Sequence, residues 1–183
     1  MPSSPAARRR KAAIAATLTA AVLALTGCAP IVALDAAADS NDPGCAEISV
    51  RLPDTVADKP QRETNAQATG AWGTPTVVLL RCGVPPIGPT TKPCVSVNGI
   101  DWVLMTDPTA KSIVYQTFGR TPATEVIIDH VAGVSDSAVL PDLASAIATV
   151  KQTQKCLSTL DTDPTTSPNP GQTSPTPSPT PGL

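Results

Sequence analysis

One stretch decides the fold: Cys94-Val-Ser-Val-Asn-Gly-Ile-Asp-Trp-Val-Leu-Met105, in which two alternating apolar runs flank an Asn-Gly pair. Asn98-Gly99 predicts a two-residue type I′ turn, because both central residues of that turn need positive φ angles. Such a turn pairs Val95 with Trp102 across an apolar face. The opposite face then carries Ser96, Asp101 and Val103. We therefore expect a hairpin with one core-facing side and one side at least partly in water.

Further strands are predicted on both sides of this hairpin. Runs rich in apolar and β-branched residues mark strands at residues 76–82, 113–118 and 124–131. Residues 54–71 are polar and lack periodicity, so we expect a long loop there. Residues 83–93 contain four prolines and cannot form an inner strand.

Two helices are predicted at the ends of this strand block. Asp42-Pro43 marks a helix start, followed by apolar residues at helical spacing: Cys45, Ile48 and Leu52. A short strand over residues 48–52 is the alternative. A second helix is expected over residues 140–155, beginning at Pro141-Asp142. The sequence thus predicts an α+β domain: an antiparallel sheet of four or five strands, with a C-terminal helix and a short N-terminal helix packed on one face.

The N-terminus has the pattern of an export signal. Four basic residues, Arg8 to Lys11, precede an apolar run over residues 12–25, which is shorter than the roughly 20 residues of a spanning helix. Leu25-Thr26-Gly27-Cys28 resembles the lipobox of bacterial lipoproteins, in which cleavage precedes a cysteine that carries lipid. We expect residues 1–27 to be a signal peptide and Cys28 to anchor the protein at the outer face of the cell membrane. Simple cleavage to a soluble protein is the alternative.

Composition divides the remaining chain into three parts. Residues 28–42 are expected to be a tether, residues 43–157 a single domain, and residues 158–183 a disordered tail rich in Pro, Thr and Ser. From Cys28 onward the chain has nine basic and 15 acidic residues, a net charge of −6. With two Trp, one Tyr and one Phe, it also lacks a base-stacking platform. Nucleic acid is therefore not an expected partner.

No constellation in the sequence has the spacing that a known chemistry requires. His130 is the only histidine, and on the expected last strand Asp129 points to the opposite face. The four cysteines after Cys28 are 37, 12 and 62 positions apart, unlike the closely spaced ligand pairs of structural zinc. We therefore predict no catalytic residue, no metal and no cofactor. Three arginines are candidates for a ligand or anion contact, with salt bridges as the plainer interpretation: Arg62, Arg81 and Arg120.

Four segments together carry a family resemblance: Leu25–Cys28, Ala71–Val84, Val97–Trp102 and Gly119–Pro122. They look like an uncharacterised family of actinobacterial secreted or lipoprotein domains, over about residues 45–155. That family has no assigned activity, so the resemblance implies a location and a fold but no catalytic residue. Its genes are often found near a D-alanine–D-alanine ligase gene, which implies a cell-envelope setting by association.

The resemblance also favours one disulfide pairing among three. Cys45 and Cys82 lie in the shared segment, whereas Cys94 and Cys156 look like additions to the family pattern, so bonds Cys45–Cys82 and Cys94–Cys156 are expected. The alternative is Cys82–Cys94 with Cys45–Cys156, and it stays open at this point. An even number of exported cysteines is typical of disulfides.

Two classes of function follow. The first is a non-enzymatic envelope lipoprotein that binds or scaffolds, with the membrane as a partner through Cys28 and envelope proteins or peptidoglycan as further candidates. The second is an envelope hydrolase that acts on cell-wall material through acidic residues: Asp54, Asp58, Glu63 and Asp101. A solvated acidic surface explains these carboxylates more simply.

Overall fold

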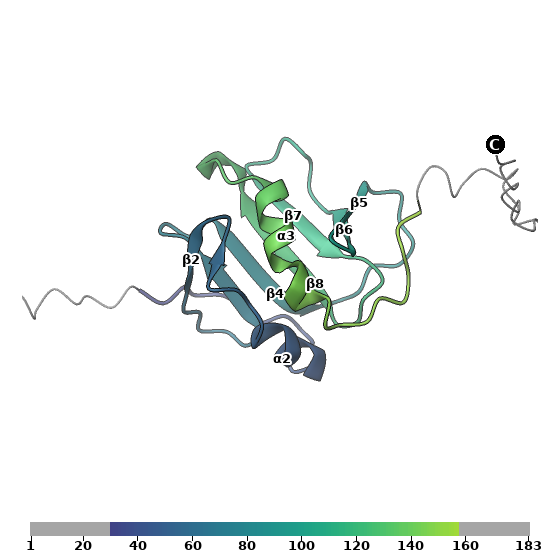
Figure 1. Ribbon diagram of the computed structural model, residues 1–183, viewed down its shortest axis with the longest axis horizontal. Coiled ribbons are helices and arrows are strands. Elements are labelled where there is room, and N and C mark those ends of the chain that lie inside the picture. The colour runs from purple at the N-terminus through teal and green to yellow at the C-terminus, as the bar shows by residue number, and fades with distance from the viewer. Residues whose placement is uncertain (1–29, 158–183) are drawn as a thin grey trace, which may run out of the picture.

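The structure is a computed structural model, and it describes residues 30–157 of the 183. The expected signal peptide, Cys28 and the expected tail lie outside the described residues. Within them, eight strands form one antiparallel sheet in the order β1-β2-β3-β4-β8-β7-β6-β5 (Figure 1). The elements are α2 (Pro43–Ser49), β1 (Thr55–Val56), β2 (Lys59–Arg62), β3 (Thr69–Trp72), β4 (Val78–Val84), β5 (Cys94–Val97), β6 (Ile100–Leu104), β7 (Ser112–Thr117), β8 (Ala123–Asp129), a 3-10 turn η2 (His130–Ala132) and α3 (Asp136–Ile147).

The expected sheet of four or five strands is wrong, and the domain is mostly an eight-stranded sheet. The three additional strands, β1 to β3, come from the polar segment 54–71 that was expected to be a loop. They are two to four residues long, and β2 consists of a proline and three polar residues, so no apolar alternation marks them. Backbone pairing sets their register, with Arg62 opposite Ala71 and Trp72 opposite Val78. Long-range backbone pairing therefore formed strands in a segment whose local sequence has no strong preference for β structure.

The hairpin at the centre of the sequence is confirmed. Val95 pairs with Trp102, and both turn residues have positive φ, 49° at Asn98 and 78° at Gly99. The second face of the hairpin is partly in water, as expected, because Ser96 on β5 is exposed, but the β6 half of that face is covered. Asp101 is 6% exposed and Val103 is fully buried, because other segments of the chain cover that face.

The α2 helix begins as predicted. Asp42 precedes it with an extended backbone, and its carboxylate accepts a hydrogen bond from the backbone N–H of Gly44 at 2.7 Å. This helix packs into a small apolar cluster that is separate from the main core. The cluster consists of Cys45, Ile48, Ala68, Cys82, Ala146 and Val150. The alternative of a strand over residues 48–52 is thereby excluded.

The α3 helix begins and ends earlier than predicted. It starts at Asp136 and ends at Ile147, so Pro141 is its sixth residue rather than its first. The missing N–H of Pro141 leaves one carbonyl of the first turn without a helical partner. Val150 lies beyond the helix yet is buried, which explains why its spacing resembled a further helical turn.

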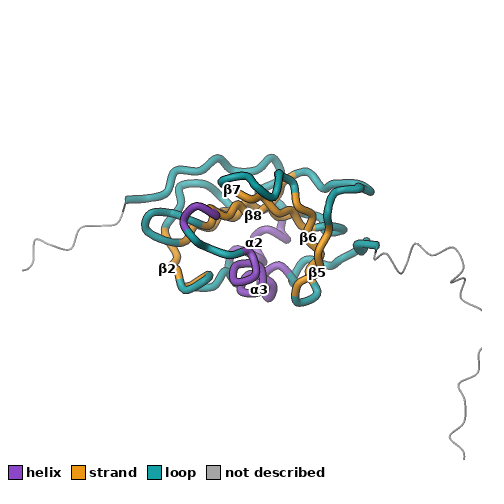
Figure 2. The backbone as a smooth tube through the Cα atoms, turned by 90° about the horizontal axis from the view of Figure 1, so that it is seen from above, coloured by secondary structure: helices purple, strands orange, loops and turns teal. Residues whose placement is uncertain are grey.

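The main core lies between α3 and the sheet. Figure 2 shows α3 on one side of the strands and long loop segments on the other. From the helix, Val139, Leu140, Leu143 and Ile147 are buried against sheet residues that include Trp72, Leu80, Trp102 and Val126. Each such side chain contributes roughly 1.5–3 kcal/mol through burial.

Two end segments of the described chain are bound to the sheet. We call residues 30–42 the N-terminal strap and residues 150–157 the C-terminal strap. The N-terminal strap, in the region expected to be a tether, donates from Val32 N to Glu63 O and from Asp39 N to Gly83 O, both at 2.9 Å. The C-terminal strap donates from Thr153 N to Gly119 O at 2.7 Å. Both straps therefore belong to the folded domain.

Candidate functional site

The three candidate arginines lie on different elements, and each has its own protein partner. Arg62 on β2 donates to the carbonyl oxygen of Pro30 in the N-terminal strap. Arg81 on β4 forms an ion pair with Glu125 on β8, with 2.7 Å between Nη2 and Oε1. Arg120 lies between β7 and β8 and is 5% exposed. The structure does not direct the three guanidinium groups at one shared anion position, and the salt-bridge interpretation is confirmed for Arg81.

Arg120 and Asp101 form a buried polar network beneath the C-terminal strap. The Asp101 carboxylate accepts hydrogen bonds from Gln152 Nε2 and from Cys156 N, both at 2.8 Å. Arg120 donates to the carbonyl oxygen of Val150. Burial lowers the pKa of Arg120 below its ordinary value, and the nearby Asp101 charge acts in the opposite direction. Both charged side chains are engaged in contacts with the segment that follows α3, so the role of this network is structural.

His130 has no arrangement that would support hydrolysis. It lies in the 3-10 turn after β8, so the expectation that it continues the last strand is wrong. Asp129 caps that turn, since its Oδ1 accepts from Val131 N at 3.0 Å and from Ala132 N at 3.3 Å. His130 Nε2 is buried and has no hydrogen-bond partner among the residues that the structure describes. Asp129 therefore does not orient the imidazole as a catalytic triad would require.

The acidic residues considered for hydrolysis lie toward opposite ends of the strand order, and Asp54 directly precedes the edge strand β1. Asp58 lies in the turn between β1 and β2, and Glu63 follows β2 directly. Asp101 lies on β6, near the opposite end of the strand order, and its carboxylate is already hydrogen-bonded. The described structure thus does not place Asp58 or Glu63 with Asp101 as a carboxylate pair.

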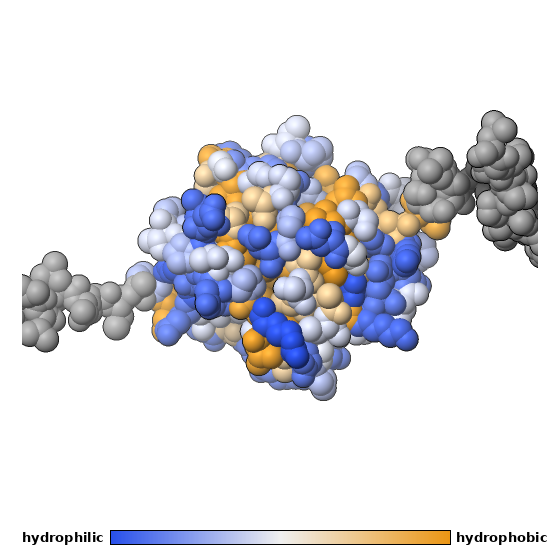
Figure 3. Space-filling model, in the orientation of Figure 1, coloured by the Kyte–Doolittle hydropathy of each residue, from blue (hydrophilic) through white to orange (hydrophobic). Residues whose placement is uncertain are grey.

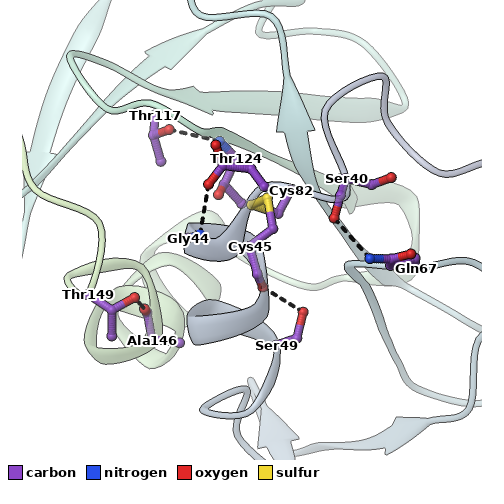
Figure 4. The surroundings of a disulfide bond; sticks show 11 residues. Ser40, Gly44, Cys45, Ser49, Gln67, Cys82, Thr117, Thr124, Ala146 and Thr149 are labelled. Atoms are coloured by element: carbon purple, nitrogen blue, oxygen red, sulfur yellow. Dashed lines mark hydrogen bonds between the residues drawn. A yellow bond between two sulfur atoms is a disulfide. The ribbon is translucent and has the colours of Figure 1, made fainter.

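The four cysteines form two disulfides, in the pairing that the resemblance favoured. Cys45 on α2 is bonded to Cys82 on β4, with 5.5 Å between their Cα atoms. Figure 4 shows this bond joining the helix to the strand, close to Gly44 and Thr124. Cys94 on β5 is bonded to Cys156 in the C-terminal strap, with a Cα separation of 6.1 Å.

A cleft that the sequence did not predict lies beside the second disulfide. It has a volume of about 460 Å³, within the range of small-molecule sites. Its floor includes Val103 and Phe118, and its walls come from residues 89–92 and 154–157. No single stretch contains these parts, so only folding assembles them. The one available signal was Val103, an apolar side chain on a face expected to meet water.

Metal and membrane sites were also sought within residues 30–157. In that range, no group of three or more His, Cys, Asp or Glu side chains is placed to hold a metal ion. Nor does any helix there have the length and apolarity to cross a membrane.

These features define a class of small, mostly sheet domains that are linked by disulfides. A family model described as "Protein of unknown function (DUF3515)" matches residues 11–156, and the chain belongs to this family. The expected membership of an uncharacterised family is thereby confirmed, and the description of the family assigns no activity. No curated protein and no solved structure matches the chain significantly.

Proposed function

We propose that this protein is an exported lipoprotein of the cell envelope, anchored by lipid on Cys28. Its domain acts outside the membrane as a non-enzymatic binding or scaffolding module. The disulfide framework carries this proposal. Two disulfides in a domain of this size are typical of oxidising compartments outside the cytoplasm. The basic and apolar N-terminal residues and the lipobox-like Leu25–Cys28 supply a route to that compartment.

The N-terminal strap gives the anchored protein a definite orientation. Pro30 is held at β2 by Arg62, and Pro30 follows Cys28 by two positions, with only Ala29 between them. Two residues reach at most about 7 Å. A lipid on Cys28 therefore keeps the β1–β2 edge of the sheet next to the membrane. Because β5 is at the opposite end of the strand order, the β5 edge and its cleft point away from the bilayer.

Support for a non-enzymatic role comes from what the polar side chains do. Asp101 and Arg120 are occupied in holding the C-terminal strap, and Asp129 caps a turn. Asp101 lies on β6, several strands away from Asp58 and Glu63 at the β1–β2 edge, so these three carboxylates do not share one cleft. A binding module needs no such constellation, whereas a hydrolase does.

Metabolic lipid labelling tests the anchor. The expected result is a lipid-labelled protein that loses its label and its membrane association in the Cys28→Ala variant. Normal anchoring of Cys28→Ala would contradict the proposal.

Fluorescence quenching by a bilayer tests the orientation. A fluorophore on Gln61→Cys, at the β2 edge, should be quenched by a headgroup quencher, whereas one on Ser96→Cys, at the β5 edge, should not. Both positions are exposed, so the two variants are a matched pair. Equal quenching would contradict the short anchor.

Pull-down with the domain tests the binding role. We expect saturable capture of an envelope protein or a peptidoglycan fragment without turnover. Turnover of cell-wall material that is lost in Asp58→Ala or Glu63→Ala would instead establish the hydrolase.

A further inference from the structure

The cleft beside Cys94–Cys156 has an apolar floor. Val103 is fully buried, and Phe118 is 8% exposed. Both lie on the sheet face opposite α3, because Trp102 and Tyr115, one and three residues away, belong to the main core. A ligand that enters this cleft can contact Phe118 and the exposed Leu157, while Val103 packs beneath the surface without exposed area.

The walls of the cleft carry positive charge. Lys92 comes from the Pro-rich loop and Lys155 from the C-terminal strap, and no acidic residue lines the cleft. Neither lysine forms an ion pair within residues 30–157, where the ion pairs are Arg51–Glu47 and Arg81–Glu125. In a chain whose net charge is negative, two lysines facing one cleft without a carboxylate are a local exception. They favour an anionic group at the cleft mouth.

The cleft is held open by bonds on both walls. On the strap side, the Cys94–Cys156 disulfide and the Cys156 N–H to Asp101 hydrogen bond fix the wall. On the loop side, Lys92 Nζ donates to the Met105 carbonyl at 3.2 Å, and Leu104 N donates to Pro93 O at 2.9 Å. A preorganised cleft loses less free energy to ordering when a ligand binds.

The face of the domain that carries α3 differs from the cleft in its surface pattern. Hydrophobic surface there occurs in small areas separated by hydrophilic ones (Figure 3). The exposed large hydrophobic residues lie on separate segments: Ile31, Val50, Val95, Val131 and Leu157. Leu157 alone among them lines the cleft.

We propose that this cleft binds a small amphipathic anion, with its apolar body on Phe118 and Leu157 and its anionic group between Lys92 and Lys155. The volume of about 460 Å³ accommodates a bicyclic or short-chain apolar body with one carboxylate, sulfonate or phosphate. This inference rests on the proposed binding role and assigns it a ligand class. It also places the ligand at the β5 edge, which points away from the anchor.

Two fluorescent probes of similar shape test the proposal: anionic 1-anilinonaphthalene-8-sulfonate and neutral N-phenyl-1-naphthylamine. They are titrated into the mature chain, residues 28–183 with Cys28→Ala. We expect saturable binding of the anionic probe at one site, at least about tenfold tighter than the neutral probe. Binding at several sites, or equal affinity for both probes, would overturn the proposal.

Substitutions locate the binding. Lys92→Ala with Lys155→Ala should weaken the anionic probe about tenfold and the neutral probe much less, because the loop wall loses the Lys92 contact with Met105 but keeps the bond from Leu104 N to Pro93 O. Lys111→Ala with Lys151→Ala is the matched control, because both lysines are exposed and neither lines the cleft. Gln154→Trp, which fills the cleft from an exposed position, should weaken both probes. Unchanged binding in the first variant, or equal loss in the control, would refute the site.

A chain that ends at Leu157 tests the other occupant, the segment 158–183 of the protein itself. We expect this chain to bind the anionic probe as the mature chain does. Binding that appears only after the truncation would show that segment 158–183 fills the cleft, which overturns a small-anion site. An envelope partner that is still captured by the double lysine variant would uphold the proposed function and refute the cleft as its site. Binding of the anionic probe by a chain that captures no envelope partner would uphold the cleft as an anion site and refute the proposed function.

Discussion

The N-terminal strap and the C-terminal strap each cross the sheet at a glycine with positive φ, close to a disulfide. The N-terminal strap crosses at Gly83, where a Cβ would collide with the backbone of Asp39. The C-terminal strap crosses at Gly119, where a Cβ would collide with the backbone of Gln154. Both crossings need a residue that has no side chain and tolerates positive φ, which only glycine supplies without strain.

The straps differ in what holds them. The N-terminal strap is held by backbone bonds such as Asp39 N to Gly83 O and, at its exposed end, by Arg62 through the Pro30 carbonyl, and the nearby Cys45–Cys82 bond lies in a buried apolar cluster. The C-terminal strap is held by the buried charges of Asp101 and Arg120, and its disulfide borders the cleft. Backbone bonds survive most substitutions, whereas a buried charge network depends on side-chain identity. The C-terminal strap should therefore be the more sensitive of the two to single side-chain changes.

Removal of each disulfide should give the largest effects. Loop-closure entropy assigns about 4 kcal/mol to each bond, slightly more to Cys94–Cys156 because its loop is longer. Packing reverses this order, since Cys45 and Cys82 are fully buried. We expect the Cys45→Ala, Cys82→Ala double variant to lose more unfolding free energy in urea than the Cys94→Ala, Cys156→Ala variant. The opposite order would mean that loop length outweighs packing.

Asp101→Asn should cost about 2–4 kcal/mol, because a buried guanidinium loses its nearby negative charge and a hydrogen-bond acceptor becomes a donor. Asp39→Asn in the N-terminal strap is the matched control, and it should change stability by less than about 0.5 kcal/mol. Asp39 is exposed and uses its backbone for the strap contact. Urea unfolding measures both variants, and equal losses would remove the distinction between the straps.

Gly83→Ala and Gly119→Ala should each destabilise the protein by more than Gly133→Ala. All three glycines have positive φ, so a backbone strain of about 1 kcal/mol is common to them. A Cβ at Gly133 meets no atom within 4 Å, whereas at the other two it would displace a strap. Thermal unfolding compares the three. A Gly119→Ala variant as stable as Gly133→Ala would show that the C-terminal strap can shift at little cost.

Arg81→Ala should have a small effect, below about 1 kcal/mol, because its ion pair with Glu125 is partly exposed. This pair lies outside both straps and supplies a reference value. A double-mutant cycle with Glu125→Ala measures the coupling. A coupling above 2 kcal/mol would place this pair among the determinants of stability, alongside the strap contacts.

The smallest effect is a pH dependence of stability that comes from Tyr115. This pH dependence is absent at neutral pH. Burial, and then the hydrogen bond to Asp136, raise the pKa of Tyr115 above its ordinary value of 10.0. The folded state therefore favours the neutral phenol, so its stabilisation is complete below pH 10 and is lost as pH rises further. Tyr115→Phe should lose stability less steeply above pH 10 than the original chain. Parallel pH profiles of unfolding free energy would contradict the shifted pKa.

Local sequence predicted the parts of the fold whose geometry depends on neighbouring residues. Asn98-Gly99 has few alternatives to a type I′ turn, and Asp42-Pro43 satisfies the first turn of α2 by itself. The pairing of the four cysteines followed from the family resemblance. By contrast, the start of α3 was misplaced, because Pro141 is usual at a helix start and only tertiary packing of Val139 and Leu140 carried the helix further upstream.

The sequence by itself determined the central hairpin, the N-terminal cap of α2, the family and the pattern of an export signal, since each of these is written in adjacent residues. The tertiary structure decided the strands β1 to β3, the two straps, the network of Asp101 and Arg120, and the cleft. These features join residues far apart in the chain, such as Asp101 with Cys156 and Arg62 with Pro30. Such contacts have no local periodicity, because their free energy comes from backbone pairing and burial that exist only after the chain has folded.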